Sequence, residues 1–398
     1  MLKVEMLSTG DEVLSGQIVD TNAAWLADYF FHQGLPLCRR NTVGDNFADL
    51  VAVLAERSHH ADILIVNGGL GPTGDDLSAA AAAQAAGVSL EEHPEWLEKI
   101  AQFFARRGRP MAPSNRKQAL IPAGSELIDN PVGTACGFAL HLNRCWMFFT
   151  PGVPSEFKQM VRQEILPRIR GGFTLPEPPV CLRLTTFGRS ESDLAQLLDP
   201  LPLPEGVVMG YRSSMPIIEL KLTGPAAQRQ AMEALWSTVR EVAGDSVVFE
   251  GTEGLPAHVA RLLADQDATL SVAEQFTGGL LALQLNRAGV AIKNGEVLSR
   301  EKEPLARTLT KARALARVQN SLALVIGSQQ EEGINIALAT GKRSSAMRVL
   351  LDNPRHGPIL RQEIAAMLAL NMLRRWLEDQ PVTAQTGWVT PVEILEGE

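Results

Sequence analysis

The stretch from residue 63 to residue 87 limits most strongly what this chain can fold into. Four apolar residues at 63–66 predict a buried strand, which runs directly into the loop Asn67-Gly68-Gly69-Leu70-Gly71-Pro72-Thr73-Gly74-Asp75-Asp76. An alanine-rich helix is expected from near Asp76 to Gly87. Another strand is expected at 4–7, with helices around 25–30 and 47–54. Strand, helix, strand, loop and helix in this order predict an α/β domain with a largely parallel sheet.

The glycine-rich loop predicts a phosphate site. Its four glycines let backbone N–H groups approach a ligand closely, and the N-terminus of the following helix favours an anion. Asp75 and Asp76 stand at the same helix end, where two carboxylates would repel a phosphate unless a divalent cation lies between them. The alternative is an aspartate N-cap on a glycine-rich turn. The density of glycines and the paired acids favour the ligand site, with Asp75 and Asp76 as metal ligands.

Further polar segments are expected at the same edge of the sheet. Asp11 and Glu12 follow the first strand, and in open α/β sheets ligands bind at the carboxyl ends of the strands. A solvated turn is an equally good interpretation for either acid alone. Two loops rich in glycine and proline, at 130–134 and 150–156, adjoin apolar strand candidates and could close the same site.

The rest of the chain divides at two breaks. Glycine and proline crowd residues 170–179, and a second boundary falls at 251–255. Between them, a small α+β module is predicted, with strands at 181–187, 207–211 and 217–222 and helices at 190–198 and 226–242. Beyond them, helices are expected at 255–263, 277–285 and 359–377, and strands at 270–273, 322–326, 334–339 and 347–351. We therefore predict three parts, residues 1–170, 171–251 and 252–398.

Composition excludes several classes of protein. The 398 residues include 37 basic and 45 acidic side chains, a net charge of −8, which argues against a chain-wide surface for nucleic acid or anionic membrane. No apolar run is long enough to cross a bilayer, and the charged start is unlike a signal peptide. The four cysteines lack C-x-x-C spacing, which disfavours a zinc site or a disulfide framework. We expect a cytoplasmic protein with a small-molecule ligand.

Four motifs in order resemble the CinA family (competence/damage-inducible protein). They are Gly10-Asp11-Glu12-Val13-Leu14-Ser15-Gly16 with Asp20-Thr21-Asn22, the glycine loop, Asn130-Pro131-Val132-Gly133-Thr134, and Pro151-Gly152-Val153-Pro154-Ser155-Glu156. The resemblance implies a three-layer fold of the MoaB/Mog (molybdopterin-binding-like) type for the first part. It also implies metal-dependent hydrolysis of ADP-ribose-like pyrophosphates, a role for Asp76 in metal-assisted nucleotide chemistry, and a homodimer. Cys136 stands where the family motif usually has proline, a change that would loosen its loop.

The last part resembles the CinA carboxy-terminal domain, which deamidates nicotinamide mononucleotide in active members. Those members have Ala-Glu-Ser-Cys-Thr-Gly-Gly, with the serine as proposed nucleophile, whereas this chain has Gln275 and Phe276 at the serine and cysteine positions. An amide cannot act as that nucleophile. The family's tyrosine-containing stretch and its Gly-Pro loop are also lost, although Arg355 remains near its matching place. We predict a domain that folds without deamidating. The middle part resembles the family's small KH-like connector, without a G-x-x-G clamp for RNA.

The resulting hypothesis is a metal-dependent nucleotide pyrophosphatase site in the first part, with Mg²⁺, Mn²⁺ or Co²⁺ as the cation. Asp76, Asp75, Asp11 and Glu156 are the predicted catalytic residues, and the sequence does not choose between Glu156 and Asp11 as base. The residues predicted to line the ligand are Gly68, Gly69, Gly71, Thr73, Gly74, Asn130 and Gly133. Two alternatives stay open: a sensor or scaffold that binds nucleotides without turnover, and a pterin-binding protein.

Overall fold

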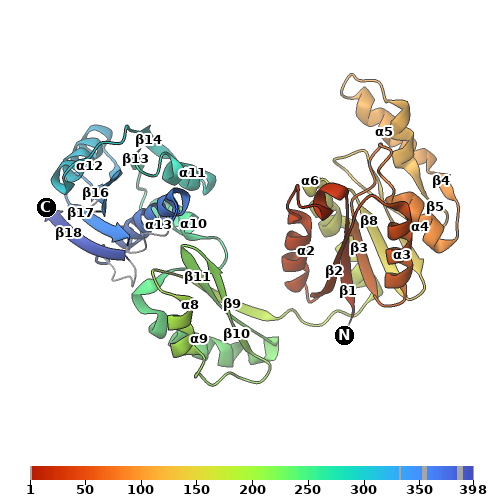
Figure 1. Cartoon of the computed structure of the whole chain (residues 1–398), viewed down its shortest axis with the longest axis horizontal. Helices are drawn as coiled ribbons and strands as arrows, with labels where there is room; N and C mark the ends of the chain where they lie inside the picture. Colours follow the sequence, from red (N-terminus) through yellow and green to blue (C-terminus); the bar gives the residue numbers. More distant parts are fainter. Residues whose placement is uncertain (1, 331–332, 352–355, 383–388, 398) are drawn as a thin grey trace. The chain divides into compact units, whose positions relative to one another are not determined.

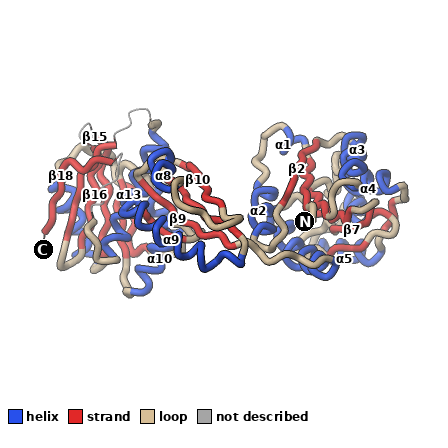
Figure 2. Tube along the Cα trace, turned by 90° about the horizontal axis from the view of Figure 1, so that it is seen from below, coloured by secondary structure: helices blue, strands red, loops and turns tan. Residues whose placement is uncertain are grey.

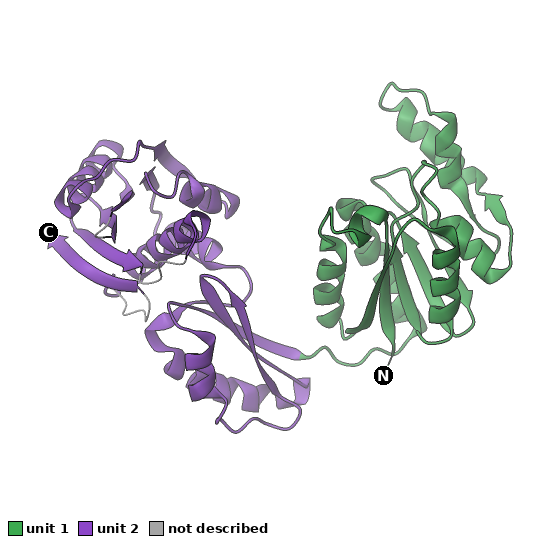
Figure 3. Cartoon of the chain, viewed as in Figure 1, with its two compact units in different colours: residues 1–179 green, residues 180–398 purple. Residues whose placement is uncertain are grey.

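The computed structural model describes residues 2–330, 333–351, 356–382 and 389–397. They form two compact units, residues 1–179 and 180–398 (Figure 3). The predicted boundary at residue 170 falls inside a helix, because α7 (Leu166–Gly172) continues to Gly172. The predicted division of the remainder at 251 lies within the second unit, between two separate sheets.

A six-stranded sheet forms the centre of unit 1, in the order β2-β1-β3-β8-β7-β6. The four strands β2, β1, β3 and β8 are parallel, and β7 and β6 continue the sheet antiparallel. This arrangement confirms the predicted α/β domain with a largely parallel sheet. The strand bounds are β1 (Val4–Thr9), β2 (Leu37–Val43), β3 (Ile63–Asn67), β6 (Glu126–Ile128), β7 (Gly137–Leu142) and β8 (Cys145–Thr150).

Helices cover both faces of this sheet and make three layers (Figure 1). Alternating strand residues serve opposite faces: Leu7 and Val66 pack with α3 (Phe47–Ser58) and α4 (Ser78–Ala86), while Met6 and Ile65 pack with α2 (Thr21–Phe31) and α6 (Pro154–Met160). The helix α6 continues through the π-helical turn η2 (Val161–Ile165) into α7. Both apolar faces of the sheet are therefore covered, as a parallel sheet requires.

The remaining elements of unit 1 lie beside the carboxyl ends of the strands or extend from the sheet. A short α1 (Asp11–Leu14) follows β1. The segment between α4 and β6 contains β4 (Leu90–Glu92), α5 (Pro94–Ala105), the 3₁₀ helix η1 (Pro113–Ala119) and β5 (Leu120–Pro122), with β4 and β5 paired antiparallel. The indole N–H of Trp96 on α5 donates to the Thr134 carbonyl at 2.9 Å, which ties this segment to the domain.

Unit 2 begins with a four-stranded antiparallel sheet in the order β10-β11-β9-β12. Its strands are β9 (Val180–Phe187), β10 (Val208–Ser214), β11 (Ile217–Gly224) and β12 (Val247–Glu250). The helices α8 (Glu191–Leu198) and α9 (Arg229–Ala243), with the 3₁₀ turns η3 (Ala226–Gln228) and η4 (Gly244–Ser246), complete it. The helices share a core with the sheet through Leu194, Leu220 and Trp236. The α+β composition matches what the sequence predicts for this segment.

A second six-stranded sheet follows in the order β14-β13-β15-β16-β17-β18 (Figure 2). Its strands are β13 (Leu270–Glu274), β14 (Ile292–Val297), β15 (Leu322–Gln330), β16 (Gly333–Ala339), β17 (Ser344–Leu351) and β18 (Val389–Gly397); its helices are α10 (Leu255–Asp265), α11 (Leu280–Arg287), α12 (Leu305–Gln319) and α13 (Pro358–Leu377). The predicted helix at 277–285 begins only at Leu280, because Gly278 and Gly279 adopt positive φ (62° and 96°). In the described part of the chain, no helix has the length and apolar character to span a membrane.

Candidate functional site

A cavity of about 480 Å³ opens at the carboxyl ends of the parallel strands of unit 1. Residues after β1, β3 and β8 line it together with the start of α2, which agrees with the general position of ligand sites in open α/β sheets. Its size lies within the range of small-molecule sites. The lining takes residues from all four segments that the sequence analysis singled out, at 10–22, 67–76, 130–134 (through Thr134) and 151–156.

The glycine loop crosses this cavity in a conformation that requires its glycines. The Gly68 N–H donates to the Thr150 carbonyl at 2.9 Å, and the Ser78 hydroxyl donates to the Gly68 carbonyl at 2.7 Å. Gly69 has φ of 69°, and a Cβ there would lie 2.3 Å from Ser78 Oγ. A side chain would therefore be both strained and obstructed at this position.

Asp76 is held in a turn that ends the loop. Its Oδ2 accepts hydrogen bonds from the Thr73 backbone N–H at 2.8 Å and from the Thr73 hydroxyl at 2.5 Å. This turn delays the helix, so that α4 begins at Ser78 rather than near Asp76. The N-cap residue of α4 is Leu77, so the expected alternative of an aspartate N-cap is wrong.

Asp75 is exposed beside Asp76 and carries a lowered pKa. The Thr73 side chain is the largest cause, and the positive charge of Lys117 adds to it. Lys117 comes from η1 and donates from Nζ to the Thr73 carbonyl. Thr73 thus holds the Asp76 carboxylate in place, and the positive charge of Lys117 acts on the neighbouring Asp75.

A second acidic pair lies across the mouth of the cavity. The Asp45 backbone N–H donates to Asp11 Oδ1 at 3.0 Å, and the Asp11 N–H donates to Asp45 Oδ2 at 3.1 Å. Partial burial raises the pKa of Asp45, and the charges of Asp11, Glu12 and Asp75 raise it further, against a backbone hydrogen bond that lowers it. These acids therefore share one electrostatic environment. Asp11 itself does not line the cavity, whereas Glu12 and Asp45 do.

Glu156 reaches the cavity from the first turn of α6. Its Oε2 accepts a hydrogen bond from Asn130 Nδ2 at 2.7 Å, and Asn130 Oδ1 accepts from the Gly133 N–H at 3.0 Å. A Cβ at Gly133 would lie 2.1 Å from Glu156 Oε2. Asn130 and Gly133 do not themselves line the cavity, and their contacts hold the Glu156 carboxylate in place.

An amide network in the cavity wall joins the loops. Asn67 Nδ2 donates to the Pro151 carbonyl at 2.8 Å, and Asn22 Nδ2 donates to Asn67 Oδ1 at 3.0 Å and to the Gly152 carbonyl at 2.8 Å. The ends of β3 and β8 and the start of α2 are therefore fixed relative to one another. In the sequence, the motif positions of Asn22 and Asn67 were the only sign of this role.

The predicted site residues thus fall into two groups. Residues on the cavity wall are Gly68, Gly69, Gly71, Asp75, Asp76 and Glu156. Residues just behind or beside the wall are Asp11, Thr73, Gly74, Asn130 and Gly133. The cavity is also lined by Asp20, which the sequence analysis gave only as part of a motif, and by Asp45 and Gln118, which it did not predict as site residues.

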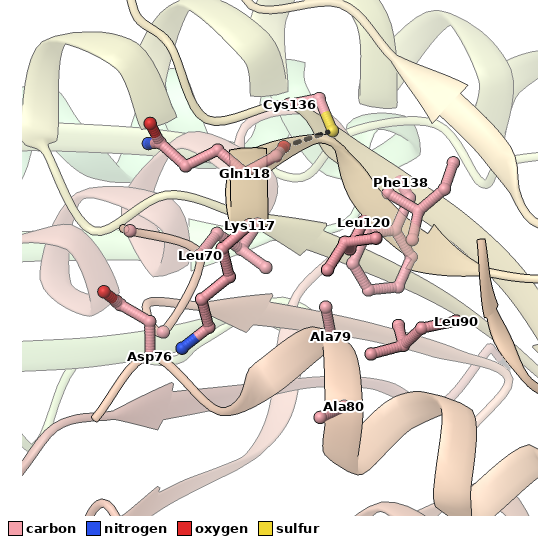
Figure 4. Close-up of a pocket in the computed structure, with 13 residues that line it drawn as sticks. Leu70, Asp76, Ala79, Ala80, Leu90, Lys117, Gln118, Leu120, Cys136 and Phe138 are labelled. Carbon is pink, nitrogen blue, oxygen red and sulfur yellow. Dashed lines mark hydrogen bonds between the residues drawn. The ribbon is translucent and has the colours of Figure 1, made fainter. Parts of the chain in front are cut away.

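A smaller pocket of about 70 Å³ (Figure 4) adjoins the cavity and shares Gly69, Leu70, Gly71, Asp76 and Gln118 with its wall. Leu70, Ala79, Leu120 and Phe138 make it largely apolar, and Lys117 lies at its edge. The buried Cys136 thiol donates to the Gln118 carbonyl at 3.3 Å, and burial raises its pKa to about 12. This bond ties the loop to η1, and the expected loosening relative to a proline stays a prediction.

Comparison with known proteins finds a family match for the first domain and relatives that match the whole chain. Residues 5–171 match the family described as a probable molybdopterin binding domain. A CinA-like protein of Escherichia coli (strain SMS-3-5 / SECEC) is 65% identical over 398 residues and 99% of each chain. The chain belongs to the CinA-like family. A second relative, the NMN amidohydrolase-like protein YfaY of E. coli K12, is 64% identical over 99% of each chain. A CinA crystal structure from Thermoplasma acidophilum covers 43% of this chain and 96% of its own, with 27% identity and a TM-score of 0.38.

In the carboxy-terminal part of this CinA-like chain, the two altered motif residues, Gln275 and Phe276, both contact neighbouring side chains. Gln275 is buried, and its Oε1 accepts a hydrogen bond from the Ser328 hydroxyl at 2.9 Å. Phe276 packs under Arg300, whose guanidinium lies 5.5 Å from the ring centre. A cavity of about 520 Å³ lies beside them. Among the described residues on its wall, Ser328 has the only hydroxyl, and this hydroxyl donates to the Gln275 amide oxygen, which cannot take its proton.

Glu274, in the same CinA-like motif, has a structural role. The buried carboxylate accepts hydrogen bonds from the Thr277 hydroxyl at 2.6 Å and from the backbone N–H groups of Gly279, Leu281 and Ala282 at 2.8 to 3.1 Å. These groups form the N-terminus of α11, so the chain's own carboxylate occupies that helix end. Arg355, which the sequence analysis noted near this site, lies outside the described residues.

Proposed function

We propose that unit 1 hydrolyses ADP-ribose-type nucleotide pyrophosphates with the help of a divalent metal ion. One observation carries the proposal: Asp75 and Asp76 lie in the wall of a nucleotide-sized cavity, beside the N-terminus of α4, which no side chain of the described residues caps. Unsatisfied backbone N–H groups at a helix start favour an anion. Carboxylates at the same place favour a cation between themselves and that anion.

The phosphates are proposed to bind along the glycine loop. Gly68, Gly69 and Gly71 line the cavity and carry no side chains, so the loop backbone can approach a ligand closely there. The N-terminus of α2 is a poorer phosphate site, because Asp20 Oδ1 accepts from the Ala23 N–H at 2.8 Å and already caps it.

Asp75 and Asp76 fit the requirements of a hard cation such as Mg²⁺, Mn²⁺ or Co²⁺. Within the described residues, no three His, Cys, Asp or Glu side chains are grouped to hold a metal. Two carboxylates completed by substrate phosphates and water are a usual arrangement for Mg²⁺. When bound, such an ion withdraws charge from the pyrophosphate and lowers the pKa of a bound water.

Glu156 is the better placed of the two candidate bases. It lines the cavity, and Asn130 holds its carboxylate, whereas Asp11 is engaged with Asp45. We propose that Glu156 takes a proton from the attacking water. The water oxygen forms a bond to one phosphorus, the bridging P–O bond breaks, and the bridging oxygen leaves with the other phosphate.

The test is a screen of metals against nucleotides with the full-length wild type. ADP-ribose with Mg²⁺, Mn²⁺ or Co²⁺ should yield AMP and ribose 5-phosphate, and excess EDTA should stop the reaction. AMP serves as a control substrate, since it has no pyrophosphate. Binding of ADP-ribose without turnover under any metal would contradict hydrolysis and favour a sensor or scaffold.

Molybdopterin binding is a second candidate, favoured by the match of residues 5–171 to a probable molybdopterin binding domain. Thermal unfolding separates the two ligands, because a ligand that binds only the folded state raises Tm. A larger rise with molybdopterin than with ADP-ribose at equal concentration would favour the pterin role.

For the carboxy-terminal domain we propose an inactive deamidase-like fold. The amide of Gln275 stands at the serine position of active relatives and cannot act as that nucleophile, so no nicotinic acid mononucleotide should form from nicotinamide mononucleotide. Product formation is measured by chromatography of reaction mixtures. Deamidation that Gln275→Ala abolishes would prove this proposal wrong.

A further inference from the structure

The cavity and its adjoining pocket are strongly unbalanced in charge. Six acidic side chains line them: Glu12, Asp20, Asp45, Asp75, Asp76 and Glu156. Among the described residues on the two walls, Lys117 is the only lysine or arginine. An anionic ligand that enters this site meets one positive side chain on the described walls, while Arg40 lies 4.0 Å from the Asp20 carboxylate. The chain as a whole carries a net charge of −8.

The backbone that carries Lys117 is held firmly. Its neighbour Arg116 bonds to both oxygens of Glu92 at 2.8 to 3.0 Å, and Asn115 donates to Gln118 at 2.9 Å. The Cys136 thiol holds the Gln118 carbonyl. These contacts fix the starting point of the Lys117 side chain, which extends toward Asp76 and the glycine loop (Figure 4).

The Lys117 ammonium group has a neutral hydrogen-bond acceptor. Nζ donates to the neutral Thr73 carbonyl, and in the described part of the chain no ion pair is recorded for Lys117. An ammonium has three donors, and lysine binds phosphate as a compact point charge. A phosphate on the glycine loop next to Thr73 would offer this group a charged partner in place of a neutral one.

We propose that Lys117 recognises the pyrophosphate of the ligand, by moving its ammonium from the Thr73 carbonyl to a phosphate oxygen. The ligand class is a nucleoside diphosphate derivative. The inference rests on the proposed function for the position of the phosphates, and it assigns Lys117 to ligand binding rather than to the chemical step.

Binding measurements on Lys117→Met test the proposal. Isothermal titration with ADP-ribose should show a Kd raised about tenfold or more, and the same change is expected for inorganic pyrophosphate. Lys117→Arg should restore most of the affinity, because it restores the charge. Lys99→Met is the matched control: Lys99 lies on α5 of the same unit, outside both pockets, and pairs with Asp129.

Measuring Mn²⁺ binding without nucleotide distinguishes ligand recognition by Lys117 from a purely structural role of this residue. Loss of a nearby positive charge should leave Mn²⁺ affinity unchanged or raised, whereas a disordered loop would lower it. Weakened binding of both Mn²⁺ and nucleotide would overturn the inference, and so would an unchanged Kd for ADP-ribose and pyrophosphate. Wild type that binds ADP-ribose without hydrolysing it would contradict the proposed function alone. Wild type that binds neither probe would contradict both.

Discussion

Asp76→Asn should reduce the metal-dependent hydrolysis of ADP-ribose at least about 100-fold, which corresponds to about 2.7 kcal/mol of lost transition-state stabilisation. The substitution removes the negative charge proposed to hold the cation. It keeps a side-chain oxygen that can accept from the Thr73 N–H and hydroxyl, so the turn should persist. The measurement is kcat/KM at saturating Mg²⁺ and again at saturating Mn²⁺.

Two controls make this result specific. Asp265→Asn, at an exposed position at the end of α10, removes the same charge from unit 2 and should leave activity unchanged. Thermal unfolding of Asp76→Asn should agree with wild type within about 2 °C, as expected for a substitution with little effect on stability. Full activity in Asp76→Asn would remove Asp76 from the proposed mechanism.

Gly71→Ala should lower the same activity about 100-fold while the domain stays folded. A Cβ at Gly71 would lie 2.5 Å from Asp76 Oδ2 and 2.9 Å from its Cγ, so the carboxylate must move away from Thr73. Displacement of a positioned group by about 1 Å can reduce a rate by about two orders of magnitude. Gly71 is not in the left-handed region, so an alanine backbone is not strained there.

Gly74→Ala is the matched control in the same loop. No heavy atom lies within 4 Å of a Cβ at Gly74, and its φ is also outside the left-handed region. Its activity should stay within about twofold of wild type, in the range expected when no interaction is lost. Equal activities of Gly71→Ala and Gly74→Ala would show that the Asp76 carboxylate does not need its present position.

Much of the fold could be predicted because its signals are local. The apolar run at 63–66 and the glycines that follow it specify a buried strand and a turn within a few residues of sequence. The start of α4 was less predictable. The Thr73 and Asp76 side chains bond to each other and close a turn, although Asp76 alone has the pattern of a helix N-cap.

The sequence by itself determined the α/β order, the glycine loop and the pairing of Asp75 with Asp76, because each depends on residues close together in the chain. Only the tertiary structure decided which distant groups join them. The sheet order places β8 beside β3, which brings Glu156 to the cavity 80 residues after Asp76, and η1 carries Lys117 to the Thr73 carbonyl. Such contacts depend on strand pairing and loop closure across the whole domain, which no local spacing of residue types encodes.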